Sequence, residues 1–153
     1  MRIVVTGAFG FIGSHFAKWV FNLDNDIKIL VVDNCTYAAN KSNLNGITYE
    51  HLHKDICDVT AEDLGEYDYL VNFAAESHVD NSIKDGRPFV RTNVEGTFNL
   101  LEVARQNPNL KKFIQISTDE VYGDMDEYGE GVLADESFNL IGSSYYSSTK
   151  ASA

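Results

Sequence analysis

The chain has 153 residues, of which 44% are hydrophobic, so it is long enough for one domain with a sizeable core. Its 12 basic and 23 acidic residues give a net charge of -11, which excludes the basic surface that a nucleic-acid polymer or an anionic membrane would need. No stretch reaches the roughly 18–20 apolar residues of a membrane span. A strand-like run follows directly after Met1 and Arg2, so we expect no signal peptide and a cytoplasmic location.

Strand-like and helix-like segments alternate along the chain, which predicts an α/β fold with a parallel sheet. The expected strands are residues 2–6, 27–32, 47–52, 69–75 and 112–116. The expected helices are residues 11–23, a short one within 58–65, residues 88–107, and one that starts near Tyr145. Residues 33–46 and 123–144 are rich in Asn, Gly or acidic residues and predict loops.

Apolar side chains recur at helical spacing in both long predicted helices. In residues 11–23 they are Ile12, Phe16, Trp19, Val20 and Leu23. In residues 88–107 the expected apolar face consists of Val90, Val94, Phe98, Leu101 and Ala104.

The first predicted strand leads into a glycine-rich turn, TGAFGFIG at residues 6–13, which opens a helix. This pattern is a variant of the dinucleotide-binding fingerprint: Gly7 permits the turn, Gly10 lets the backbone approach a pyrophosphate, and Gly13 lets the helix lie close to the sheet. Asp33 ends the second strand, 20 residues beyond Gly13, where the fingerprint expects an acid on the adenosine ribose. The carboxylate favours NAD and repels the 2′-phosphate of NADP, so NAD is the predicted cofactor.

Two further motifs carry candidate catalytic groups. The segment STDEVYG, residues 117–123, follows the fifth strand, and its adjacent carboxylates Asp119 and Glu120 could serve as an acid and a base. Read from spacing alone, a solvated acidic turn explains them equally well. Tyr146 and Lys150 are four residues apart and share one face of a helix. We expect the Lys150 ammonium, with a bound nicotinamide ring, to lower the pKa of Tyr146 so that the phenolate can act as a base.

No metal site is predicted. Cys35 and Cys57 lack metal-ligand spacing and fit a reducing compartment, and His51 and His53 have no third ligand nearby in the sequence.

Together these motifs resemble the extended short-chain dehydrogenases, and among them the dTDP-glucose 4,6-dehydratases. The matching segments are TGAFGFIG (6–13), DNCTYAAN (33–40), DI (55–56), AAESHVD (74–80), TN (92–93), STDEVYG (117–123) and YSSTK (146–150). They span the chain in order, and STDEVYG is the most specific of them. The resemblance implies a doubly wound Rossmann-type sheet and NAD-dependent dehydration of a nucleotide sugar.

The resemblance also implies roles for single residues. Tyr146 would be the base on the sugar 4-hydroxyl, with Lys150 supporting it and Thr118 hydrogen-bonding the same region. Hydride would pass from C4 to NAD and later return to C6, so that NAD is regenerated. Glu120 would remove the C5 proton and Asp119 would protonate the departing C6 hydroxyl, although the two acids could exchange these roles.

Binding residues follow from the same resemblance. The implied cofactor contacts are Gly7, Gly10, Phe11, Ile12, Gly13, Asp33, Asn34, Cys35, Thr36, Asp55, Ile56, Phe73, Ala74, Ala75, Thr92, Tyr146 and Lys150. Ser77 and Thr118 would contact the substrate.

Family members are much longer than this chain. We therefore expect residues 1–153 to form an NAD-binding domain that lacks its sixth strand, without the substrate domain that would grip the nucleotide. For the full-length protein the resemblance implies a homodimer. Two alternatives stay open: a nucleotide-sugar 4-epimerase of the UDP-glucose type, ranked second because of the Asp119–Glu120 pair, and a non-catalytic NAD-binding module.

Overall fold

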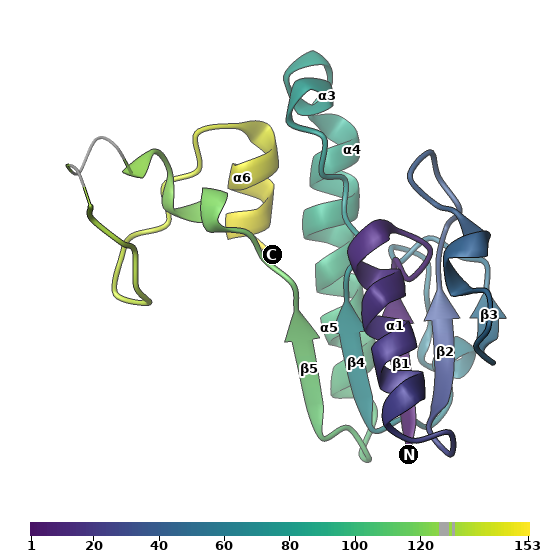
Figure 1. Ribbon diagram of the computed structural model, residues 1–153. Coiled ribbons are helices and arrows are strands. Elements are labelled where there is room, and N and C mark those ends of the chain that lie inside the picture. Colours follow the sequence, from purple (N-terminus) through teal and green to yellow (C-terminus); the bar gives the residue numbers. More distant parts are fainter. Residues whose placement is uncertain (126–128, 130) are drawn as a thin grey trace.

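The computed structural model describes residues 1–125, 129 and 131–153. In this part of the chain five strands form one parallel sheet in the order β3-β2-β1-β4-β5 (Figure 1). Their bounds are β1 Arg2–Thr6, β2 Lys28–Val32, β3 Glu50–Leu52, β4 Tyr69–Asn72 and β5 Lys112–Gln115. The chain winds outward from β1 to β3 and then returns to add β4 and β5 on the other side. The predicted doubly wound α/β sheet is therefore confirmed.

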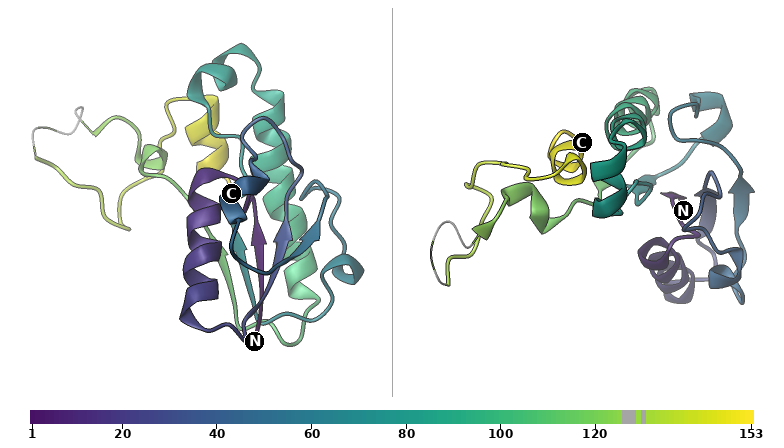
Figure 2. Two further views of the ribbon diagram at one scale, coloured as in Figure 1. Left: turned by 45° about the vertical axis from the view of Figure 1, so that its right-hand side comes forward. Right: turned by 90° about the horizontal axis from the view of Figure 1, so that it is seen from above.

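Helices cover both faces of this sheet. The helical elements are α1 Phe11–Leu23, η1 Lys41–Leu44, α2 Ala61–Leu64, α3 Val79–Lys84, α4 Arg87–Phe89, η2 Val90–Gly96, α5 Thr97–Arg105, η3 Asp119–Tyr122 and α6 Tyr145–Ala151. α4, η2 and α5 form one continuous helix, and its middle part, η2, is a π-helix. α1 lies on one face of the sheet and this long helix lies on the other (Figures 1 and 2).

The strands feed two separate cores because successive side chains on a strand point to opposite faces. On β1, Ile3 and Val5 join the cluster under α1, whereas Val4 joins the cluster under α5. Most residues of the three central strands β1, β2 and β4 are buried, as expected of a parallel sheet between two helical layers, whereas the edge strands β3 and β5 are partly exposed.

The predicted apolar face of residues 88–107 is wrong at Val90, Phe98 and Leu101, whereas Ala104 is buried and Val94 is partly buried. Val90, Phe98 and Leu101 are 45%, 66% and 44% exposed. The buried side of the helix consists of Phe89, Asn93, Gly96, Thr97, Leu100, Val103 and Ala104. A π-helix has a wider turn than an α-helix, so a 3.6-residue period assigns its faces incorrectly. Three of the stripe residues predicted in α1, Ile12, Trp19 and Leu23, are likewise exposed.

Several boundaries also differ from the sequence-based expectation. β3 is shorter than predicted, and η1, α3 and η3 were not predicted. β4 ends at Asn72, and the Ala74 N–H donates to the Thr6 hydroxyl at 3.2 Å. The predicted loop 123–144 includes residues 126–128 and 130, which lie outside the described residues. Among the residues that are described, no helix is both long and apolar enough to cross a membrane.

Candidate functional site

A cleft of about 390 Å³ opens at the carboxyl ends of the strands. Of the predicted cofactor contacts, all except Cys35 line it: Gly7, Gly10, Phe11, Ile12, Gly13, Asp33, Asn34, Thr36, Asp55, Ile56, Phe73, Ala74, Ala75, Thr92, Tyr146 and Lys150. Ser77, a predicted substrate contact, lines it as well. Ligands of open α/β sheets bind at this edge, where the strand order reverses, so the cleft has the position expected of a cofactor site.

The glycine-rich turn is held by close backbone approaches. Gly7 has a φ of +63°, and a Cβ at this position would stand 2.7 Å from the backbone nitrogen of Ala74. A Cβ on Gly13 would stand 2.5 Å from the Gly7 carbonyl oxygen. Larger residues would therefore push α1 away from the sheet. No side chain caps the N-terminus of α1, so its first backbone N–H groups are available to an anion such as a diphosphate.

Asp33 is buried at the end of β2 and its carboxylate is fixed by two backbone donors. The Phe9 N–H donates to Oδ2 at 3.0 Å, and the Cys35 N–H donates to Oδ1 at 2.8 Å. Each carboxylate oxygen can accept more than one hydrogen bond. The pair of oxygens therefore retains capacity for two ribose hydroxyls. Cys35 contributes through its backbone, in a left-handed conformation with φ of +54°, and not through its thiol.

Tyr146 and Lys150 reach the cleft from α6. Lys150 is only 7% exposed, and its Nζ donates to the Ile116 carbonyl at 2.5 Å, which ties α6 to the end of β5. Burial lowers the pKa of Lys150. Burial also raises the pKa of Tyr146, whereas a hydrogen bond with Thr118 lowers it. Burial is the largest influence on the pKa of Tyr146, and the Lys150 ammonium is directed at the Ile116 backbone carbonyl.

Thr118, Asp119 and Glu120 do not line the cleft itself. Thr118 caps the 3-10 helix η3, where its hydroxyl accepts from the Glu120 N–H at 3.3 Å. η3 packs against α6, and both carboxylates lie close enough to raise the pKa of Tyr146. The structure thus gathers the acid pair and the tyrosine on one side of the cleft.

Other residues of the site were not predicted from sequence. Those that line the cleft are Val32, Ala38, Ala39, Lys54, Ile116 and Ser117. Val32, Ile116 and Ser117 stand at strand ends, which the position rule for α/β sheets could have indicated.

Asn93 lies behind the cleft and is 1% exposed. Its side-chain amide exchanges hydrogen bonds with both backbone groups of Glu76, at 2.9 and 3.0 Å, and donates to the Thr149 hydroxyl at 3.0 Å. It joins the loop after β4 to α6, a contact between distant segments that spacing in the sequence does not reveal.

Comparison with known proteins places this arrangement in a family. The chain is 43% identical to the low-salt glycan biosynthesis protein Agl12 of Haloferax volcanii, over all of this chain and 49% of that protein. It is 37% identical to the dTDP-glucose 4,6-dehydratase DesIV of Streptomyces venezuelae, solved with NAD bound, with a TM-score of 0.87 over 99% of this chain and 49% of that one.

A UDP-N-acetylglucosamine 4-epimerase from Methanobrevibacter ruminantium is also similar, at 30% identity and a TM-score of 0.85 over 99% of this chain and 47% of that one. The chain thus spans about half the length of the relatives that it matches. The family model described as GDP-mannose 4,6 dehydratase matches residues 4–153. The chain therefore belongs to the GDP-mannose 4,6 dehydratase family.

Proposed function

We propose that this chain is the cofactor-binding part of an NAD-dependent nucleotide-sugar 4,6-dehydratase, a lyase with dTDP-glucose as the leading substrate and UDP-glucose as the second. The observation that carries the proposal is the placement of Asp119 and Glu120 on η3 against Tyr146 on α6. Oxidation at C4 needs one base, and loss of water across C5 and C6 needs an additional base and an acid. The three groups provide this set.

The cleft fits NAD on three features. The uncapped N-terminus of α1 suits the pyrophosphate, the fixed Asp33 carboxylate suits the adenosine ribose, and Gly10, which lines the cleft, has no side chain to block close approach. Phe11 and Ile12 would lie along the pyrophosphate, and Asp55 and Ile56 at the adenine. Bound NAD would accept hydride from C4 of the sugar and return it to C6.

The protein groups would then move the protons. Tyr146 would take the proton of the 4-hydroxyl, with Thr118 hydrogen-bonding its phenol. Lys150, held by the Ile116 carbonyl, would support it from one turn further along α6. A ketone at C4 acidifies the C5 proton, which Glu120 would remove while Asp119 protonates the departing C6 hydroxyl.

Product analysis distinguishes the dehydratase from its alternatives. We expect the longest natural polypeptide that contains these 153 residues to convert dTDP-glucose, with NAD, to a 4-keto-6-deoxy sugar that has lost one water by mass spectrometry. A product of unchanged mass that is epimeric at C4 would establish the epimerase instead. NAD binding without any turnover would leave the non-catalytic module as the function.

Asp33 should decide the cofactor preference. We expect the unmodified chain to bind NAD more tightly than NADP in titration calorimetry, because the carboxylate repels a 2′-phosphate. Asp33→Asn should weaken NAD binding by about 10-fold or more, since hydrogen bonds to a charged group are worth about 1.5–3 kcal/mol. It should also lower the ratio of the affinity for NAD to the affinity for NADP.

Urea unfolding of the same variant shows whether the fold tolerates asparagine, which keeps only one side-chain oxygen to accept from the Phe9 and Cys35 N–H groups. Unchanged NAD affinity in a folded Asp33→Asn protein would remove Asp33 from the ribose site.

A further inference from the structure

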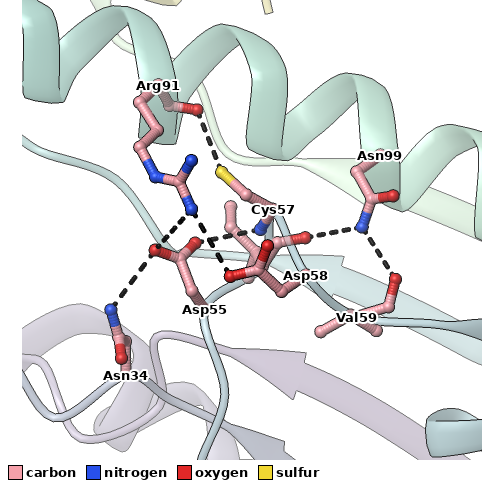
Figure 3. A network of polar contacts seen from close by, with 8 residues as sticks. Asn34, Asp55, Cys57, Asp58, Val59, Arg91 and Asn99 are labelled. Atoms are coloured by element: carbon pink, nitrogen blue, oxygen red, sulfur yellow. Dashed lines mark hydrogen bonds and ion pairs between the residues drawn. The ribbon is translucent and has the colours of Figure 1, made fainter.

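The loop of residues 55–59, at the adenine end of the proposed NAD site, is docked onto the long helix (Figure 3). Asn99 donates to the carbonyl oxygens of Ile56 and Val59, both at 2.8 Å. Gly96 provides the space for the loop, because a Cβ there would stand 2.5 Å from Cδ1 of Ile56. The loop backbone is therefore held by α5 and η2 independently of any charge.

A second set of contacts acts on side chains of the same loop. The Arg91 guanidinium lies between two carboxylates, 3.7 Å from Oδ2 of Asp55 and 3.4 Å from Oδ2 of Asp58 (Figure 3). The backbone carbonyl of Arg91 accepts from the Cys57 thiol at 3.2 Å. Burial raises the pKa of that thiol to about 12, so it remains a protonated donor.

The Asp55 carboxylate receives donors on both oxygens. The Cys57 N–H donates to Oδ1 at 2.9 Å, and the Asn34 side-chain amide donates to Oδ2 at 3.4 Å, beside the Arg91 guanidinium. Asp55 lines the cleft, whereas Arg91 does not. Any influence of Arg91 on a bound ligand must therefore pass through Asp55 or through its charge at a distance.

We propose that Arg91 is a positioning residue that holds the Asp55 carboxylate as an acceptor for the exocyclic amino group of a purine. The proposal rests on the proposed NAD site. A carboxylate accepts hydrogen bonds and cannot donate them, so it selects an amino group and rejects a carbonyl oxygen at the same ring position. An arginine that spans two carboxylates fixes one orientation of Asp55 and reduces the repulsion between Asp55 and Asp58.

Two dinucleotides test this selection: NAD, and nicotinamide hypoxanthine dinucleotide, which has an oxygen in place of the adenine amino group. The unmodified chain should bind NAD more tightly. Arg91→Gln should weaken NAD binding by about 1.5- to 5-fold, the range of a partly exposed ion pair, and leave the analogue nearly unchanged. Arg91→Lys keeps the positive charge but loses the planar guanidinium that can contact two carboxylates. It should therefore recover only part of the preference for NAD over the analogue.

Arg105→Gln is the matched control, because Arg105 also stands on this helix and pairs with Glu102 at 2.6 Å, and it does not line the cleft. It should change neither affinity. Equal weakening of both dinucleotides by Arg91→Gln would mean that only the charge matters, and unchanged affinities would remove any role; either result overturns the proposal. If the unmodified chain binds neither dinucleotide, the proposed NAD site fails and the inference fails with it.

Discussion

Replacing Tyr146 with Phe should lower the turnover of dTDP-glucose by about 10²–10⁴-fold, the usual contribution of one general base. Phe retains the ring contact with Phe89, whose centroid is 6.4 Å from that of Tyr146, so the fold and the cleft should be preserved. The measurement is kcat in the longest natural polypeptide that contains this chain, together with NAD affinity. We expect NAD affinity to change far less than kcat, because the proposed role of the phenol is to act on the substrate hydroxyl.

Tyr145→Phe is the control. Tyr145 precedes Tyr146 on α6 but is 59% exposed and does not line the cleft, so its hydroxyl should be dispensable. Similar losses in the two variants would mean that the phenol of Tyr146 is not the base.

The pH profile gives a second readout of the same group. Burial raises the pKa of Tyr146, Glu120 and Asp119 raise it further, and the hydrogen bond with Thr118 lowers it. Since the proposed mechanism uses the phenolate, turnover should rise with pH on the alkaline side of neutrality. Thr118→Val should move this rise to higher pH by removing the contact that favours the phenolate. A profile that Thr118→Val leaves in place would contradict the assignment.

Most of the fold could be predicted from sequence because strand signals are local. The buried runs of β1, β2 and β4 are almost entirely apolar, and their alternation with helices predicts a parallel sheet. The orientation of the long helix could not be predicted. Its buried side contains Asn93, Gly96 and Thr97, which are selected for hydrogen bonding and close approach and not for hydrophobicity.

The candidate site also contains residues that could be predicted from the sequence and residues that could not. The glycine-rich turn and Asp33 were predicted because the spacing of a βαβ unit constrains them within one short segment. Asn93 and Arg91 were missed because their partners are far away in the sequence, in the loop after β4, in α6, and in the loop of residues 55–59. The acid pair lies outside the cleft because both residues belong to η3, a short 3-10 helix. A segment this short has no sequence periodicity from which the helix could be predicted.

Replacing Gly7 with Ala should have the largest effect on stability. The residue has a φ of +63°, and a left-handed conformation costs a non-glycine residue about 1–2 kcal/mol. Its Cβ would also overlap the backbone of Phe73 and Ala74, at 2.7–2.9 Å, and overpacking of this kind costs about 1–3 kcal/mol. Because backbone atoms cannot rotate away, we expect a combined loss of about 2–5 kcal/mol, a large part of the about 5–15 kcal/mol that stabilises a typical domain.

Gly46→Ala separates the two contributions. Gly46 has a φ of +92°, but a Cβ there would meet nothing within 4 Å, so this variant should lose only the conformational part. Urea unfolding of both variants measures the free energies, and the difference between them gives the cost of separating β1 from β4 at the strand ends. That separation would also widen the turn on which the pyrophosphate is proposed to lie, so Gly7→Ala should lose NAD affinity as well. A Gly7→Ala protein no less stable than Gly46→Ala would mean that the approach of Gly7 to Ala74 does not hold the turn in place.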